Sequence, residues 1–291
     1  MSIQQHSPFH EGEQLLQSRV GKREKVEALG QRVIRDYLPQ QHQMFYAGLN
    51  MLVLGGLDPD GHPWVLPVLG EPGFVRALDD RHLSIESNGL DVQSFERNLG
   101  SAIGVLGIDL ATRRRNRVNG RVVDVSALGF VLEVEQSFGN CPQYIQVRSL
   151  QDSPRQPSAS DTVDFDAEAR ALIAQADTLF VSSFMRDSTG SAHVDVSHRG
   201  GSPGFIQIAD HQITVPDYKG NNHFNTLGNF VLNPVAGVTI PDFRRGRLLQ
   251  MTGTVELLES SNLEDAERAW RFTPDQSRWI NEGIHKERGE I

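Results

Sequence analysis

An internal repeat limits the folds open to this chain more than any other feature of its sequence. The tripeptide Pro-Gly-Phe occurs at 72–74 and again at 203–205, a displacement of 131 residues. A second marker, displaced by 133 residues, is an aspartate before an arginine-rich turn with a glycine after it: Asp109 and Gly120, then Asp242 and Gly253. Between the markers each half runs strand, strand, helix, strand, basic turn, strand, which predicts a duplicated fold.

Short apolar runs with turn residues between them predict strands in both halves. Three hairpins are expected, pairing 51–57 with 63–69, 73–78 with 82–87, and 178–185 with 192–198. Further strands are expected at 101–110, 117–125 and 130–138. About six short strands per half, with one or two helices, indicate a small antiparallel barrel rather than a βαβ fold. The expected fold class is therefore mainly β with flanking helices, α+β.

Helical periodicity and composition suggest where the chain divides. Helices are expected at 11–38, ended by Pro39, at 91–99, from Pro142 and at 166–176, with a polar helical tail from Leu263 onward. A Ser-, Pro- and Gln-rich stretch at 151–165 is the best candidate linker. The predicted organisation is an N-terminal helical segment at 1–40, a first repeat at 41–150, the linker, and a second repeat with a helical tail at 166–291.

Composition excludes several classes of protein. The formal net charge of −9 counts against a general nucleic-acid or anionic-membrane surface. No apolar run approaches the roughly 18 residues of a membrane helix, and the N-terminus lacks the pattern of a secretory signal. The single cysteine, Cys141, rules out an internal disulfide, which suits a reducing cytoplasm. We therefore expect a cytoplasmic protein that binds neither nucleic acid nor membrane.

The stretch 194–253 carries most of the candidate binding residues, in loops between short strands. Its polar groups are Ser197, His198, Arg199, Lys219, Asn221, Asn222, Asn225 and Arg244. Lysine is rare in this chain, and Lys219 is the only one between Lys25 and Lys286. Its place beside three asparagines fits an anion site, although an ordinary surface lysine fits as well. Two glycines after Arg199 permit a flat ligand to approach the backbone closely.

Two arginine-rich turns occupy matching positions in the repeat. The first is 113–117, with Arg114, Arg115, Asn116 and Arg117, and the second is 243–247. So many guanidinium groups need carboxylates, phosphate or solvent around them, so a phosphate site and a solvated hairpin tip both explain these turns.

Other common sites are not supported by the sequence. It has no GxGxxG after a strand and no GxxxxGK[ST], which argues against Rossmann and P-loop nucleotide sites. The ten histidines form no HExxH and no tight cluster, so no metal site is expected. Ser197 and His198 do not lie in a Gly-x-Ser-x-Gly elbow, which disfavours a nucleophilic triad. Cys141 suits a small core residue or a thiol at a helix start.

Five motifs together resemble one known family. They are SPFHEGEQ (7–14), RRRNRVNG (113–120), QSFGNCPQYIQVR (136–148), DVSHRGGSPGF (195–205) and YKGNNHFNTLGN (218–229). The chain resembles the pyridoxamine 5′-phosphate oxidase-like FMN-binding split barrels, and more closely a flavin-nucleotide-binding branch with some members fused to a ferredoxin-reductase-type module. The resemblance implies tandem split β-barrels of the FMN-binding type that form a pseudo-dimer from one polypeptide.

The resemblance also implies a cofactor site between the barrels. Lys219, Asn221, Asn222 and Asn225, followed by Thr226, would hold the FMN phosphate. Ser197, His198 and Arg199 would border the isoalloxazine or ribityl chain. Arg114, Arg115, Asn116 and Arg117 or Tyr144 from the first half would complete the site. The family's substrate-binding C-terminal arginine and tryptophan have no match in the tail, which argues against pyridoxamine phosphate as substrate. No reductase module is expected after Ile291.

The function expected from the resemblance is that of an FMN-dependent oxidoreductase in which the flavin performs the redox step on a small molecule. Arg199 or His198 would stabilise negative charge on the reduced ring. A separate reductase or reduced nicotinamide would supply electrons, and a homodimer is expected. Two alternatives remain open: a non-catalytic flavin-binding, electron-transfer or redox-sensing module, and a relative that binds haem.

Overall fold

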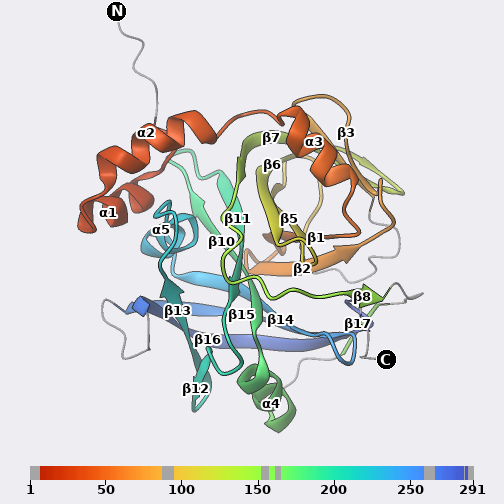
Figure 1. The fold of residues 1–291 in the computed structure, drawn as a ribbon, viewed down its shortest axis with the longest axis vertical. Helices are drawn as coiled ribbons and strands as arrows, with labels where there is room; N and C mark the ends of the chain where they lie inside the picture. Colours follow the sequence, from red (N-terminus) through yellow and green to blue (C-terminus); the bar gives the residue numbers. More distant parts are fainter. Residues whose placement is uncertain are drawn as a thin grey trace, which may run out of the picture.

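The computed structural model describes residues 7–86, 95–151, 157–160, 165–258, 266–284 and 286–287. Two large antiparallel sheets make up most of this part of the chain (Figure 1). The helices are α1 (Glu11–Arg19), α2 (Arg23–Val33), α3 (Gln40–Ala47), α4 (Ala167–Gln175) and α5 (Asn225–Leu232). The mainly β, α+β class expected from the sequence is confirmed.

The first sheet has the strand order β2-β1-β5-β6-β7-β4-β3. Its strands are β1 (Met51–Leu57), β2 (Pro63–Leu69), β3 (Val75–Ala77), β4 (His82–Glu86), β5 (Ala102–Asp109), β6 (Arg114–Ser126) and β7 (Gly129–Gly139). The hairpins expected in this half are confirmed, because β1 pairs with β2 and β3 with β4. We call this sheet the first barrel.

The second sheet has the strand order β11-β10-β14-β15-β16-β13-β12, with β9 paired to the edge of β16. Its strands are β9 (Ser158–Ala159), β10 (Thr178–Arg186), β11 (Ala192–Gly200), β12 (Gln207–Ala209), β13 (Gln212–Tyr218), β14 (Val235–Asp242), β15 (Arg247–Leu258) and β16 (Ala266–Asn281). Apart from β9, each strand takes the place of one in the first barrel. We call this sheet the second barrel, and the expected duplication is confirmed.

Two glycines of the repeat are explained by a shared β-bulge. The pairing of β6 with β7 shifts register between Asn119 and Gly120, and that of β15 with β16 shifts between Thr252 and Gly253. A Cβ at Gly120 would lie 1.9 Å from a carbonyl oxygen of β7, and one at Gly253 would lie 2.1 Å from a carbonyl oxygen of β16. Only glycine fits this approach, so the bulge requires it in both barrels.

The two barrels pack face to face with an approximate two-fold relation. Strand β5 lies against β11, and its counterpart β14 lies against β2. The contacts need glycine, because a Cβ at Gly104 would lie 3.1 Å from the backbone of Asp195 and one at Gly237 would lie 2.5 Å from the Pro63 oxygen. Side chains of the second half join the core of the first, including Phe180, Val196, Phe243, Leu248 and Ile280. The boundaries of the four predicted segments stay a prediction.

The N-terminal segment lies over the second barrel at α5 (Figure 1). A capping box begins α1, in which the His10 side chain accepts from the backbone and the Glu13 side chain accepts from the His10 N–H. Helices α1 and α5 touch where a Cβ at Gly12 would lie 2.2 Å from the Gly228 oxygen. This approach brings the start of α1 to the junction of the barrels.

The helix predictions differ from the structure in three places. The stretch 11–38 is two helices, because Gly21 adopts a left-handed φ of 66° between them, and Pro39 begins α3 instead of ending the run. No helix follows Pro142; the chain turns there, and Tyr144 has a φ of 66°. The helix expected at 91–99 lies partly outside the described residues, and 95–99 is not helical.

The predicted helical tail is also wrong: residues 266–281 form β16, the central neighbour of β15 and β13. Trp270 and Phe272 are fully buried and two positions apart, which is strand periodicity rather than helical periodicity. Pro274 is tolerated because it faces Gly253 at the bulge. A short pairing of β17 (Lys286–Glu287) with β8 (Leu150–Gln151) follows.

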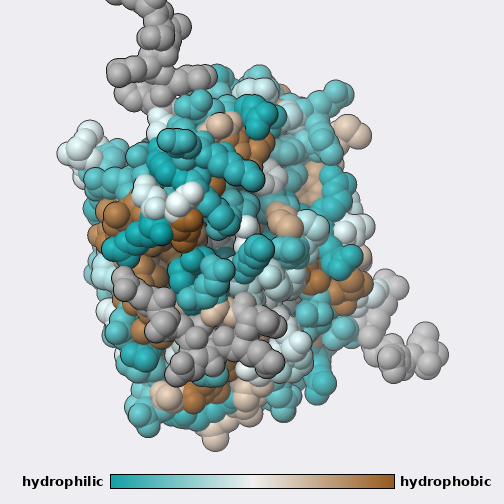
Figure 2. Space-filling view, turned by 60° about the vertical axis from the view of Figure 1, so that its left-hand side comes forward, coloured by the Kyte–Doolittle hydropathy of each residue, from teal (hydrophilic) through white to brown (hydrophobic). Residues whose placement is uncertain are grey.

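Among the described residues, no helix combines the length and the apolar character needed to cross a lipid bilayer. On the side of the molecule shown in Figure 2, hydrophobic surface occurs as separate patches within a largely hydrophilic face.

Candidate functional site

The polar residues singled out in the sequence gather in a crevice between the barrels, where β6 of the first contacts β11 of the second. A cavity of about 100 Å³ opens there, lined by β6, β11, the loop 140–144 and the segment after β13. A neighbouring cavity of about 90 Å³ shares Arg199, Asp217 and Asn221 with it and reaches the start of α5. We call these two cavities together the cation crevice.

Most of the predicted site residues line the cation crevice: Arg115, Arg117, Tyr144, Ser197, His198, Arg199, Lys219, Asn221, Asn222, Asn225 and Thr226. Arg114 and Asn116 do not line it, because alternate residues of a strand face opposite sides. The guanidinium of Arg114 lies 5.0 Å from the centre of the Phe45 ring in α3, on the opposite face of β6. Arg244, the other predicted residue, lies in the second basic turn, outside the crevice.

Arg117 ties the two barrels together at the centre of the crevice. Its Nη1 donates to Asp195 Oδ2 at 2.9 Å and to Asn225 Oδ1 at 3.0 Å, and its Nη2 donates to Ser197 Oγ at 2.7 Å. Ser197 Oγ in turn lies 2.7 Å from Thr226 Oγ1. Burial raises the pKa of Asp195, and the Arg117 guanidinium opposes that rise. Arg117, Ser197 and Thr226 are therefore held in an internal network.

Positive charge accumulates beside this network. Arg115 donates to the Cys141 carbonyl and to His198 Nδ1, and no described carboxylate pairs with it. Burial, then the neighbouring Arg117 and Arg199, lower the pKa of Arg115 to about 10. Lys219 at the rim likewise has no ion-pair partner among the described residues. Because like charges repel in a poorly solvated site, this cluster stabilises a bound anion.

Three buried nitrogens in the crevice lack a hydrogen-bond partner in the part of the chain that the structure describes: Arg117 Nε, His198 Nε2 and Arg199 Nε. His198 accepts at Nδ1 from Arg115, so its neutral ring carries the proton on Nε2. Burial lowers its pKa well below the usual value, with Arg115 and Arg199 adding to the effect. Unpaired buried donors are costly, and an acceptor group on a ligand satisfies them.

Backbone conformations that non-glycine residues seldom adopt cluster around the crevice. Tyr144, Asn222 and Phe224 have φ values of 66°, 58° and 62°. Such strain collects at binding sites, where the surrounding structure maintains it. The Tyr144 ring stacks on Tyr218 at 5.1 Å between centroids, and a Cβ at Gly200 would lie 2.1 Å from the Tyr144 oxygen. The double glycine therefore serves close backbone packing of the 140–144 loop against β11.

A larger cavity of about 330 Å³ lies on the far side of the Arg117–Asp195 pair, which we call the acid cavity. The N-terminal motif contributes His10 and Glu13 to it, and β11 contributes His193 and Asp195. Burial raises the pKa of Glu13 to about 8, and the Asp195 carboxylate adds to the rise. His10, Glu13 and Asp195 lie within the sequence motifs, but the motifs indicate no role for them, because only the fold brings the N-terminus beside β11.

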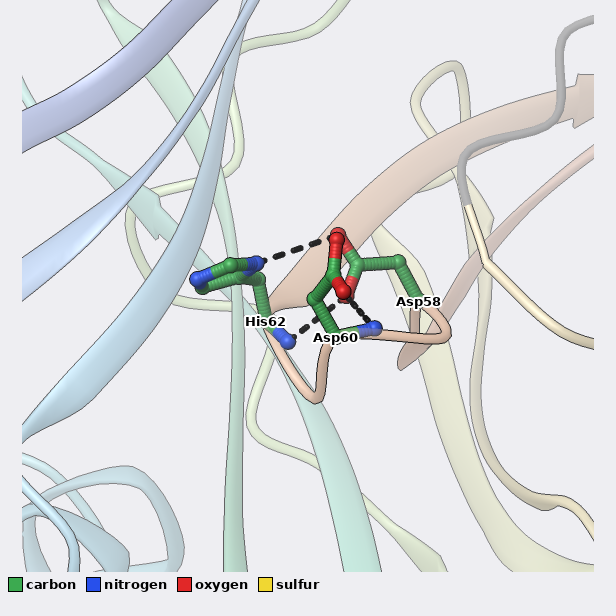
Figure 3. Close-up of side chains that lie close together, drawn as sticks. All are labelled: Asp58, Asp60 and His62. Atoms are coloured by element: carbon green, nitrogen blue, oxygen red, sulfur yellow. Dashed lines mark hydrogen bonds and ion pairs between the residues drawn. The ribbon is translucent and has the colours of Figure 1, made fainter.

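The described residues also hold one group of potential metal ligands, Asp58, Asp60 and His62, in the β1–β2 turn (Figure 3). Asp58 Oδ1 accepts from the backbone N–H groups of Asp60 and His62, and its Oδ2 accepts from Trp64 Nε1 at 2.9 Å. These bonds are those of an aspartate-stabilised hairpin turn, which explains the group without a metal ion.

No family model matches the chain, and no curated protein matches its sequence. Three similar solved structures are a candidate pyridoxamine 5′-phosphate oxidase from Lactobacillus delbrueckii, HutZ, the haem storage protein of Vibrio cholerae, and an FAD-binding protein of Mesorhizobium loti. Their sequences are 22%, 12% and 11% identical to this chain. The matches cover 36%, 41% and 43% of this chain and 95%, 96% and 98% of those chains, each with a TM-score of 0.29.

The fold class of this chain follows from its own strand order and from the packing of its two sheets. Two sheets with one strand order, packed about an approximate two-fold axis with a polar crevice between them, are tandem split barrels. The chain therefore has a split-barrel fold, present twice in one polypeptide.

Proposed function

We propose that the cation crevice binds a flavin nucleotide, FMN, and that the chain is an oxidoreductase that acts on a small molecule. The observation that supports this most is the charge of the crevice, which is lined by Arg115, Arg199 and Lys219 and by a single carboxylate among the described residues, Asp217. Asp217 Oδ1 lies 3.8 Å from Arg199 Nη2. Asp217 is shared with Arg268, whose Nε donates to it at 3.2 Å. The positive charge left over suits a phosphate dianion.

The two ends of the crevice suit different parts of FMN. Lys219, Asn221 and Asn222 lie at the open rim and suit the phosphate, whereas Asn225 is already bonded to Arg117 and Glu13. His198 and Arg199 lie deeper and offer N–H donors to a ring carbonyl edge. When bound, the flavin supplies the redox chemistry. The cations and N–H donors of the chain hold it and stabilise negative charge on its reduced ring.

The acid cavity favours an enzyme over a carrier. It adjoins the crevice across Asp195 and Asn225, and at about 330 Å³ it is large enough for a small substrate. The C-terminal segment does not cover it, since residues 266–281 are paired within the second barrel. Reduced nicotinamide or a separate reductase is the proposed electron donor. The homodimer and the cytoplasmic location stay predictions.

The test is an absorption spectrum of the purified chain, with mass spectrometry of the ligand released on denaturation. We expect flavin bands, released FMN, and loss of both in Arg199→Ala. The matched control is Arg245→Ala, which removes an exposed arginine of the second basic turn and keeps the flavin.

Released haem with its characteristic spectrum would support the haem-binding alternative. A chain without a chromophore that does not take up added FMN would overturn the proposal. If the bound flavin is not turned over by any combination of substrate with reduced nicotinamide or a reductase, the carrier or sensor alternative is supported.

A further inference from the structure

The approximate two-fold relation of the barrels creates two equivalent crevices. Because β15 corresponds to β6 and β2 corresponds to β11, the partner of the β6–β11 crevice is the β15–β2 contact. Residues can be matched through the strand pairings, because Gly120 and Gly253 mark the same bulge and Gly104 and Gly237 the same close approach. We call the β15–β2 contact the second crevice.

The matched positions differ sharply in polarity. Six polar side chains in or beside the cation crevice correspond to five apolar residues and one glutamine. Arg115, Arg117, Asp195, Ser197, His198 and Arg199 are matched by Leu248, Gln250, Trp64, Leu66, Pro67 and Val68, respectively. The cations, the neutral imidazole and the hydroxyl that would receive an anionic ligand are all missing from the second crevice.

The second crevice is filled with packed side chains. Trp64, Leu66, Val68 and Leu248 are buried within one continuous hydrophobic core. Gln250 takes the place of Arg117, yet its Nε2 donates to the Val65 oxygen at 2.8 Å and its Oε1 accepts from Arg278. Its polar groups are therefore satisfied internally.

Strand β14 also approaches β2 more closely than β5 approaches β11. A Cβ at Gly237 would lie 2.5 Å from the Pro63 oxygen, against 3.1 Å for the nearest backbone atom at Gly104. The Arg278 guanidinium covers the Trp64 ring at 4.5 Å. Composition and burial thus close the second crevice, and the close approach of β14 to β2 lies beside it.

From this asymmetry we infer that the tandem chain binds one FMN per polypeptide, in the cation crevice, and that the second crevice has become part of the core. The inference rests on the proposed function for the identity of the ligand. It sets the stoichiometry at one, where two equivalent sites would give two.

The experiment is native mass spectrometry of the full chain with saturating FMN, which counts the ligands on each polypeptide. We expect one FMN on the wild-type chain and none on Arg199→Val, which gives the cation crevice the residue found at the matched position. Val68→Ala, which shortens the matched side chain in the second crevice, is the control and should keep one FMN. Leu66→Met, which nearly conserves side-chain volume, is a second control that is easier for the core to accept.

The outcomes separate the two proposals. Two FMN per chain, or one that persists in Arg199→Val, overturns the single-site inference while the flavin function stands. No FMN on the wild-type chain overturns the proposed function itself, and the stoichiometry with it. If the wild-type chain binds one FMN, Arg199→Val loses it and both control variants retain it, the proposed function and the single-site inference are both supported.

Discussion

Glu13 is a buried carboxyl group whose ionisable partner among the described residues is His10, with His10 Nε2 3.4 Å from Glu13 Oε2. Burial lowers the pKa of His10 to about 4, so His10 is neutral near pH 7, and protonation of Glu13 is expected to control stability there. Its Oε2 accepts from the His10 N–H at 2.8 Å and its Oε1 accepts from Asn225 Nδ2 at 2.5 Å. Burial, with a smaller contribution from Asp195, raises its pKa to about 8 from the usual 4.5. In the folded chain Glu13 is therefore protonated at pH 7, whereas in the unfolded chain it is ionised.

The sign of the effect follows from proton binding. Between the two pKa values the folded state holds one more proton than the unfolded state, so stability falls as pH rises, by about 1.4 kcal/mol per pH unit. From pH 6.5 to 8 the decrease amounts to about 1.5 kcal/mol, because the folded group itself begins to ionise. His10 and His223, whose pKa values burial lowers to about 4, act in the opposite direction below pH 6.5. Above pH 6.5 His193 also contributes, because its hydrogen bonds to Glu135 and Asp187 raise its pKa. The difference between the wild type and a Glu13 variant therefore isolates Glu13.

Urea unfolding of the wild type and of Glu13→Gln between pH 5.5 and 8.5 measures this contribution. Glutamine mimics the neutral acid, so the variant gains stability relative to the wild type by about 1.5 kcal/mol between pH 6.5 and 8. The exposed neighbour Glu11 gives the control Glu11→Gln, which should run parallel to the wild type. Parallel profiles for Glu13→Gln would refute the assignment of a protonated carboxyl group at this position.

Two further predictions concern the crevice. Arg117→Met leaves Asp195 buried without its cation and should lower the free energy of unfolding in urea by about 3–5 kcal/mol. The double variant Arg117→Met/Asp195→Leu should recover most of that loss. Additive losses in the double variant would contradict this prediction. Gly200→Ala places a Cβ 2.1 Å from the Tyr144 oxygen, so the affinity for FMN, measured by fluorescence titration, should fall at least tenfold. Gly139→Ala is the control, because its Cβ meets its nearest neighbour at 3.5 Å, and it should retain the affinity for FMN. Equal affinities for the two glycine variants would argue against a role for the Tyr144 loop.

The sequence was sufficient for the architecture because the repeat is carried by positions with local steric demands. The bulge at Gly120 and Gly253 admits no side chain, and alternation of apolar residues defines most strands. The C-terminal strand β16 differs from the predicted helical tail, because its many charged residues are typical of a polar surface segment. Its pairing with two other strands overrides local preference, and that long-range effect is not visible in a single sequence.

The candidate site was only partly predictable for a related reason. Motifs predicted His198, Arg199 and Lys219 as site residues, and the structure brings them to one crevice because β11 and the segment after β13 line the same cavity. The alternation of β6, which turns Arg114 away while Arg115 and Arg117 face the ligand side, depends on where the strand begins. Glu13 could not be placed at all, since its contact with Asn225 spans 212 residues of sequence.

The tandem arrangement explains how one of two equivalent crevices could lose ligand binding while the other keeps it. In a symmetric dimer of identical subunits, any substitution that fills one site also fills the other. When both barrels belong to one polypeptide, β2 and β11 vary independently, so Leu66 and Val68 can pack into the core while Ser197 and Arg199 stay polar. Each buried aliphatic side chain contributes roughly 1.5–3 kcal/mol relative to exposure. The filled crevice thus stabilises the barrel interface, whereas the cation crevice retains the unpaired donors and strained backbone that binding requires.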